Sequence, residues 1–351
     1  MVSFKLWFFQ DPRGAFIVTL VLSHAFYVHG EESEYARASP ARQVLPLAVP
    51  PDVRLWDWAW EGTTIVSSEE RRGVRVIRIL DFAAGSLKSI ESSVYQQGEF
   101  PVLIGGGRLA YIRDGRELVL ASVGDPAPSE RVNLGEDIGL IGEVTFAAGI
   151  LWLYAIEAHT HTPNPRIYAV HLAPLRVVPL GEGYYPRTFD GSLLYFIDDK
   201  RDFSLYSIPL ADGRVSDATP TLVFGSHVYF PAVVAARSML VVQTGFKKPR
   251  IDLISANGKV IRCLSGEDRS GAHPRVSPSG KHVAFAHRED VDYRAKVLEV
   301  VDMQGRLLYQ ALIGSHPIGA AYRWSRDGDR LAVVGRAGME RTTLDIVSFG
   351  E

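Results

Sequence analysis

Short, mostly apolar runs recur along the chain, each directly after a turn. The runs are Thr64–Ser67, Leu109–Ile112, Leu151–Tyr154, Leu193–Phe196, Leu240–Gln243, Val283–Ala286 and Leu331–Val334. A strand that is apolar on both faces is typical of one packed between two neighbouring sheets. The pattern therefore predicts seven strands that are each covered on both sides.

The turns before these runs keep a nearly constant spacing of 42 to 48 residues. Their glycines are Gly62, Gly107, Gly149, Gly191, Gly280 and Gly328, with Arg237 in the remaining place. A fixed period of this length is typical of a propeller whose blades have four strands each.

The remaining strands of each repeat follow the apolar run. The next strand alternates, as in Ile251–Ile254 and Val297–Val300, which predicts a half-buried third strand. Tight turns such as Asn257-Gly258 then lead into a polar outer strand. No segment sustains a helical period with capping signals. We expect an all-β, seven-bladed β-propeller of four-stranded antiparallel blades, with six blades as the alternative.

The ring needs one more strand, because the seventh repeat reaches Glu351 directly after its third strand. An unpaired third strand would expose an edge that promotes aggregation. The stretch Arg42–Val49 has strand character and belongs to no repeat. We predict that it completes the last blade as its outer strand, where Pro46 is tolerated.

The N-terminal segment has the pattern of a secretory signal. Lys5 and Arg13 precede the apolar run Ala15–Val28, which is short for a membrane span. The alternatives are an uncleaved anchor or a buried strand. The predicted division is a signal peptide at 1–30, a linker at 31–41 and the propeller at 42–351. The predicted location is the periplasm or the cell exterior, without stable membrane insertion after cleavage.

Charge and cysteine content narrow the function classes. Lys and Arg total 38 against 40 Asp and Glu, so no overall field attracts nucleic acid, and none is expected as a partner. Cys263 is the sole cysteine. It excludes an internal disulfide and a multi-cysteine metal site, and we predict a buried, inert thiol.

Two of the repeats resemble a known family. Ser277–Phe285 and Trp324–Val333 resemble the W-S-P-D-G-x-x-I-A-F core of the WD40-like (PD40) repeats of TolB and of prolyl oligopeptidase relatives. Asp190-Gly191 and Gly105–Gly107 are degenerate copies. The resemblance implies a propeller blade and, for TolB-like proteins, a periplasmic location. The sequence contains no G-x-S-x-G nucleophile elbow, so the hydrolase chemistry of the peptidase relatives is not implied.

Candidate binding residues lie where the innermost strands begin. An aromatic residue or histidine precedes proline at five such places: Phe100, Tyr185, Phe230, His273 and His316. Glu143 lies at the equivalent place of a degenerate repeat, and Arg187 and Arg275 directly follow two of the prolines. These side chains would form a ring at the mouth of the central channel. The alternative is that the Xaa-Pro bond holds the chain extended and the aromatic ring packs between blades.

The loops between second and third strands provide a second set of candidates. These charged loops cover residues 157–165, 198–203, 245–250 and 287–295. His159 and His161 could supply two metal ligands, with His273 or His287 completing a site. A solvated loop is the favoured alternative, so we assign no metal residue.

No nucleophile and base are paired and no phosphate loop is present, so we expect no cofactor and no catalytic residue. The leading hypothesis is a non-catalytic scaffold that binds a protein or peptide through the charged loop face. The alternative is a metal-dependent hydrolase or lactonase with Glu143 and His273 at the channel mouth. A third hypothesis is a subunit of an envelope complex; otherwise we expect a monomer.

Overall fold

The chain divides into two compact units, residues 1–39 and residues 40–351. The computed structural model describes residues 7–10, 16–19, 41–46, 54–71, 74–81, 83, 86–91, 100–125, 128–135, 138–157, 165–211, 213–245, 247–266, 270–287, 297–313, 321–326, 328–336 and 342–349. In the first unit, β1 (Trp7–Gln10) pairs antiparallel with β2 (Phe16–Thr19). Within the described residues, no helix has the length and hydropathy needed to cross a membrane. The division into signal peptide, linker and propeller stays a prediction.

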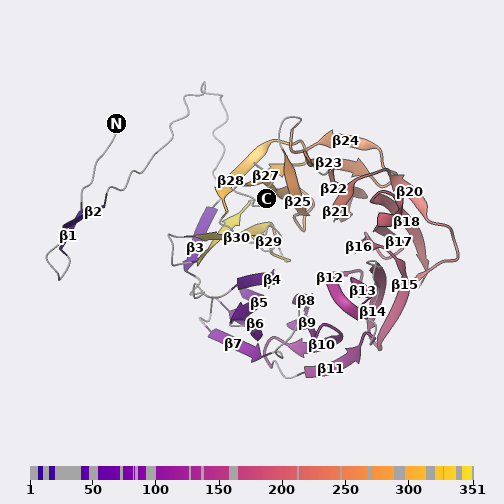
Figure 1. Ribbon diagram of the computed structural model, residues 1–351, viewed down its shortest axis with the longest axis horizontal. Helices are drawn as coiled ribbons and strands as arrows, with labels where there is room; N and C mark the ends of the chain where they lie inside the picture. Colours follow the sequence, from indigo (N-terminus) through magenta and orange to yellow (C-terminus); the bar gives the residue numbers. More distant parts are fainter. Residues whose placement is uncertain are drawn as a thin grey trace. The chain divides into compact units, whose positions relative to one another are not determined.

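The second unit is a ring of seven antiparallel sheets, as predicted (Figure 1). Blades are numbered here by their inner strands, which surround the centre of the ring in Figure 1. These are β4 (Arg54–Glu61), β8 (Val102–Gly105), β12 (Ile138–Ala147), β16 (Tyr184–Arg187), β21 (Val228–Val234), β25 (Gly271–Val276) and β29 (Tyr322–Trp324).

The second and third strands follow in each blade. The second strands are β5 (Thr64–Arg71), β9 (Arg108–Arg113), β13 (Ile150–Glu157), β17 (Leu193–Asp198), β22 (Met239–Thr244), β26 (His282–His287) and β30 (Arg330–Arg336). The third strands are β6 (Val74–Asp81), β10 (Glu117–Ser122), β14 (Pro165–Leu172), β18 (Ser204–Ala211), β23 (Arg250–Ser255), β27 (Val297–Asp302) and β31 (Thr342–Ser348).

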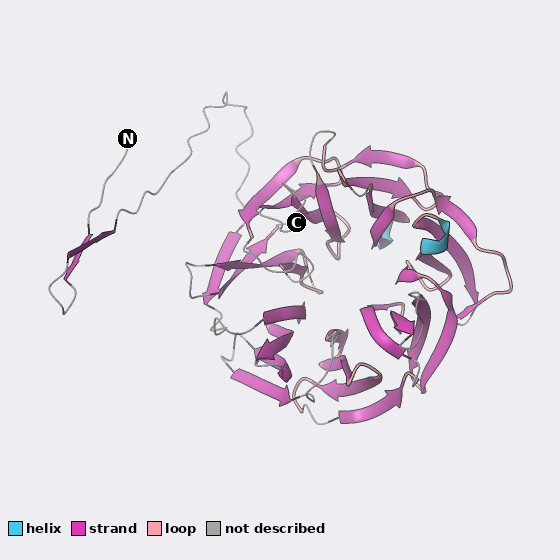
Figure 2. Cartoon of the chain, viewed as in Figure 1, coloured by secondary structure: helices cyan, strands magenta, loops and turns pink. Residues whose placement is uncertain are grey.

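The outer strands complete the blades. They are β7 (Ser86–Glu91), β11 (Pro128–Asn133), β15 (Leu175–Glu182), β19 (Arg214–Val215) with β20 (Thr221–Phe224), β24 (Val260–Cys263), β28 (Leu307–Leu312) and β3 (Ala41–Pro46). The helices of the described residues are two 3₁₀ turns, η1 (Asp199–Arg201) and η2 (Ala235–Arg237), so strands dominate the chain in Figure 2.

The N-terminal strand closes the ring, which confirms the predicted closure. β3 pairs antiparallel with β31, so Ala41 lies opposite Ser348 and Pro46 opposite Thr343. It is the outermost strand of its sheet, where a proline without an N–H is tolerated because no further strand has to pair with it.

Hydrophobic cores lie between the blades. Successive residues of β22 show why its sequence is apolar on both faces: Leu240 and Val242 pack with blade 4, whereas Val241 packs with blade 6. Seven clusters of this kind connect neighbouring blades. The cluster of Trp60 and Ile65 with Ala332 joins blade 1 to blade 7 and closes the ring.

The third strands are more buried than the alternation predicted. In β10, Leu118 and Val119 point into different clusters, and both are fully buried. Polar residues in these strands are also enclosed, since Asp252 and Glu299 are 0% and 3% exposed. The prediction of a half-buried third strand was wrong because neighbouring blades cover both of its faces.

The outer part of the sheets contains the tight turns that the sequence predicted. Gly213, Gly258 and Gly305 have φ values of 69°, 85° and 78°, a region that glycine adopts without steric cost. A Cβ at Gly258 would also lie 1.6 Å from the Val223 carbonyl oxygen.

Cys263 is only partly buried on β24, and its Sγ lies 3.4 Å from the Gly266 carbonyl oxygen.

Candidate functional site

Three consecutive blades share an unusual backbone conformation near the start of the inner strand. Tyr185, Phe230 and His273 have φ values of 51°, 47° and 54°, and each precedes a proline. A non-glycine residue rarely adopts positive φ, and a residue before proline is normally extended. Each lies in a β-bulge, where two residues face one residue of the second strand. Strain of this kind costs about 1–3 kcal/mol per residue and is found most often at functional sites.

The bulges bring the three side chains into one row. The rings of Tyr185 and Phe230 lie 5.0 Å apart, and those of Phe230 and His273 lie 3.8 Å apart, measured between centroids. His273 is held from both neighbouring blades. Its amide donates to Oε1 of Gln243 at 3.2 Å, and its carbonyl oxygen accepts from the Tyr322 hydroxyl at 2.5 Å.

Blade 3 has a glycine at the corresponding bulge. The register of β12 shifts between Ile141 and Glu143, which leaves Gly142 as the extra residue. A Cβ at Gly142 would lie 1.9 Å from Cζ of Tyr154, so the tyrosine ring covers the glycine. Tyr154 thereby extends the aromatic row, with ring centroids 5.3 Å from Tyr184 and 5.2 Å from Tyr185. Sequence analysis missed Tyr154, although glycine at an otherwise aromatic position was a usable signal.

Arg187 joins three blades at this place. Its Nη2 donates to Oε2 of Glu143 in blade 3 at 2.8 Å, and its Nε donates to the Pro231 carbonyl oxygen in blade 5 at 2.7 Å. The Arg187 and Glu143 side chains are 14% and 21% exposed. The ion pair is therefore largely shielded from water but still reached by it.

Two further arginines act on Glu143. Arg187, Arg275 and Arg323 occupy the same register position in blades 4, 6 and 7, opposite Tyr195, Ala284 and Ala332. Burial by itself would raise the pKa of Glu143, but the positive charges of Arg187, Arg275 and Arg323 outweigh burial and hold that pKa below its ordinary value. Sequence analysis did not select Arg323, because no Xaa-Pro pair precedes it.

The phenol groups of Tyr184 and Tyr185 are neutral. Burial, followed by the negative charge of Glu143, raises the pKa of Tyr185 to about 12. Burial and Asp199 raise the pKa of Tyr184 to about 12. Neutral phenols and charged guanidinium groups can donate hydrogen bonds to a ligand, which is the chemistry of binding rather than of proton abstraction.

One of the charged loops lies directly beside this row. The Tyr184 hydroxyl donates to Oδ2 of Asp199 at 3.3 Å. Phe203, which is 36% exposed, has its ring centroid 6.5 Å from that of Tyr184 and 5.3 Å from that of Tyr229. Loop 198–203 and the aromatic row therefore belong to the same face.

Phe100 and His287 lie apart from this row. Phe100 packs against the hydrophobic core between blades 2 and 3, and Tyr185 against the cores on both sides of blade 4, in agreement with the packing alternative. His287 lies opposite Gly271 at the start of β25, the strand that contains His273. The described contacts of His287 stay within blade 6, where its Nε2 lies 2.8 Å from Oε2 of Glu299. The other oxygen of that carboxylate, Oε1, accepts a hydrogen bond from Gln310 of the same blade at 3.2 Å.

The other candidates, His159, His161 and His316, lie outside the described residues. Among the residues that are described, no group of three His, Cys, Asp or Glu could hold a metal ion. Glu143, one of the two residues on which the hydrolase hypothesis rests, is paired with Arg187. That hypothesis stays a prediction.

Comparisons with known proteins show the fold. No protein-family model matches the chain, and no curated protein matches it significantly. The β-propeller domain of Cps50 (Swd1) from Myceliophteria thermophila is similar, with a TM-score of 0.60 and 11% identity over 87% of this chain and 99% of that one. A chain from the crystal structure of a mitotic checkpoint complex has a TM-score of 0.64 and 12% identity over 95% of this chain and 99% of that one. At such identity, the likeness shows that the chain is a seven-bladed β-propeller with WD40-like structural neighbours.

Proposed function

We propose that this protein is a non-catalytic scaffold that binds a protein or peptide partner at the face carrying Tyr185, Phe230 and His273. The observation that carries the proposal is the repeated strained bulge. Three blades hold an aromatic ring or imidazole at positive φ, and the three side chains meet in one row. Strain is retained where surrounding structure supports it, and it commonly pre-organises a binding surface.

The composition of the face suits a polypeptide ligand. Aromatic residues and arginine are enriched in protein interfaces because they combine apolar area with hydrogen-bonding groups. Here Phe203 is exposed beside the row, while Arg187, Arg275 and Arg323 lie close to Glu143. One structural neighbour comes from a checkpoint complex, which is consistent with a propeller that works within an assembly.

The proposed location is the periplasm or the cell exterior. It rests on the apolar run Ala15–Val28 and on the resemblance of Ser277–Phe285 to TolB-like repeats. Fractionation of native cells, with N-terminal sequencing of the purified protein, tests this part separately. An intact Met1 in a cytosolic fraction would contradict it.

Site-specific cross-linking tests the binding face. The photoreactive residue p-benzoylphenylalanine replaces Phe203 in one variant and Lys281 in a control. Lys281 is exposed and directly precedes His282, the first residue of β26, whereas His287 is the last residue of that strand. In native cells, we expect partner adducts from position 203 but not from position 281.

A second variant ties the adducts to the aromatic row. His273→Ala removes the ring that lies against Phe230 and should reduce the adduct yield from position 203 at least five-fold. Equal adducts from positions 203 and 281, or an unchanged yield in the folded His273→Ala protein, would contradict the proposal.

A further inference from the structure

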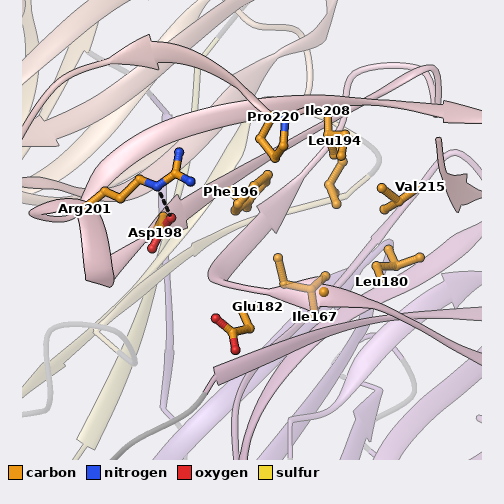
Figure 3. A pocket seen from close by; sticks show the side chains of 11 residues that line it. Ile167, Leu180, Glu182, Leu194, Phe196, Asp198, Arg201, Ile208, Val215 and Pro220 are labelled. Atoms are coloured by element: carbon orange, nitrogen blue, oxygen red, sulfur yellow. Dashed lines mark ion pairs between the residues drawn. The ribbon is translucent and has the colours of Figure 1, made fainter. Parts of the chain in front are cut away.

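A second candidate site lies away from the channel mouth, between blades 3 and 4. It is a cavity of about 160 Å³ near the outer strands. Six apolar side chains form most of its wall: Ile167, Leu180, Leu194, Phe196, Ile208 and Val215. Figure 3 shows them around a common space, with Glu182, Asp198 and Arg201 toward one end.

Two irregularities in the outer strands leave this space open. β15 contains a bulge, because Ile167 pairs with Gly181 whereas Tyr168 pairs with Pro179, and Leu180 is the extra residue. A bulge re-aims the side chain of its extra residue, and Leu180 lines the cavity. A Cβ at Gly181 would meet no atom within 4 Å.

The second irregularity is a break in the outer strand of blade 4. β20 pairs with Leu205–Ser207 and β19 pairs with Leu210 and Ala211. Ile208 lies between the two paired segments, and its side chain lines the cavity. One continuous outer strand would pair along this part of β18, whereas the break leaves Ile208, which is 6% exposed, in the apolar wall of the cavity.

The volume decides which chemical group fits. A cavity of about 150 Å³ lined by Leu, Ile and Phe accommodates benzene, whereas sites for whole small-molecule ligands measure about 300–1,000 Å³. The cavity here, at about 160 Å³, therefore suits one phenyl ring. Phe196 in its wall offers the edge-to-face contact that aromatic rings prefer.

The rim is charged, unlike the wall. Lys200 of blade 4 pairs with Glu182 of blade 3, and Nε of Arg201 lies 3.3 Å from Oδ2 of Asp198. The Lys200 and Glu182 side chains are 60% and 50% exposed. Exposed pairs contribute only about 0–1 kcal/mol, so these groups can exchange partners at little cost. An apolar cavity with such a rim matches a phenyl ring attached to a polar backbone.

We propose that this pocket receives one phenylalanine side chain from an extended segment of a partner protein, whose backbone groups and polar neighbours meet Lys200, Glu182 and Arg201. The pocket shares no residue with the aromatic row, although Asp198 and Arg201 of its rim belong to loop 198–203, which lies beside that row. Methyl shifts in the cavity wall test the pocket, and cross-linking from position 203 tests the face.

Methyl NMR of the full-length protein tests this inference with two capped peptides, acetyl-Gly-Ser-Phe-Ser-Gly-amide and its alanine counterpart. We expect saturable shifts at Ile167, Leu194 and Ile208 with the phenylalanine peptide, half-saturated on the order of 1 mM. Val283 and Val333, in blades 6 and 7, should not move. The alanine peptide should produce no saturable shift.

Val215→Phe fills the cavity and should weaken binding at least ten-fold. Val260→Phe is the matched control on an exposed outer strand, where Val260 is 45% exposed, and it should bind as the parent does. The unchanged methyl signals of blades 6 and 7 report the fold. If Val215→Phe disturbs them, Leu180→Phe replaces it.

Three results would overturn the inference. The first is equal shifts from both peptides. The second is undiminished binding in a folded, cavity-filled variant. The third is shifts from benzyl alcohol but not from the phenylalanine peptide, which would mean that the cavity takes free aromatic molecules only.

Discussion

Arg187 and Glu143 are separated by 44 positions in sequence and belong to different blades, yet Nη2 of one lies 2.8 Å from Oε2 of the other. The same guanidinium reaches the Pro231 carbonyl oxygen of the next blade at 2.7 Å. One side chain therefore connects blades 3, 4 and 5 at the point where the aromatic row passes. The candidate binding face and the cohesion of the ring depend on the same contact.

Removing one member of this pair should destabilise the protein. Arg187→Gln leaves Glu143 without its nearest positive charge, and a loss of about 1–3 kcal/mol in the free energy of unfolding is expected for a largely shielded group. The double variant Glu143→Gln/Arg187→Gln should lose less than the sum of the two single variants. Urea unfolding at pH 7 measures all four proteins, and strictly additive losses would show that the pair does not couple the blades.

The ion pair should also make stability depend on pH in the acid range. Because the folded-state pKa of Glu143 is lower than its ordinary value of 4.5, the folded state favours the ionised form. The stabilisation is complete above pH 4.5 and is lost as the pH falls through the lower folded value. Unfolding free energies of the parent and of Glu143→Gln should therefore differ at pH 6 and converge at acid pH. A difference that grew on acidification would refute this account.

Positive φ at the bulges predicts that a glycine there gives a more stable protein than an alanine, which is the reverse of the usual order within a strand. Phe230→Gly relieves the backbone strain that Phe230→Ala retains, and both remove the ring. The glycine variant should be more stable than the alanine variant by about 1 kcal/mol. Ala232, two residues along the same strand, is the control, since its φ is not positive and Ala232→Gly should destabilise by about 0.5–1 kcal/mol. Thermal unfolding compares the variants. If Phe230→Ala were more stable than Phe230→Gly, the account of a strained backbone would be contradicted.

Gly142 should tolerate a methyl group only when Tyr154 is truncated. Gly142→Ala puts a Cβ 1.9 Å from Cζ of Tyr154 in the present geometry, so the ring must move out of the aromatic row at a cost of about 1–3 kcal/mol. In a Tyr154→Ala background, the same change should cost less than about 0.5 kcal/mol. Chemical denaturation measures both costs. Equal costs in the two backgrounds would mean that the position of the Tyr154 ring does not depend on Gly142.

The candidate site was only partly predictable from the sequence. The Xaa-Pro pairs at Tyr185, Phe230 and His273 mark one equivalent position in three blades, because bulges at equivalent strand positions repeat with the blade. Phe100 carries the same dipeptide, but its φ is not positive, and it packs against the core between blades 2 and 3. A local motif cannot distinguish these outcomes, because the register between the first two strands of a blade determines whether the residue falls in a bulge.

The amino-acid pattern by itself determined the architecture: seven apolar strands at a constant spacing, turns that need positive φ, and an N-terminal strand to pair with β31. These features are local or periodic, and burial between neighbouring blades follows from them directly. Only the tertiary structure decided which side chains meet. Tyr154 fills the space above Gly142, Arg323 acts on Glu143, and the break between β19 and β20 opens a pocket against β15. Each of these depends on distances between blades, which are set by ring closure and bulge geometry rather than by any stretch of sequence.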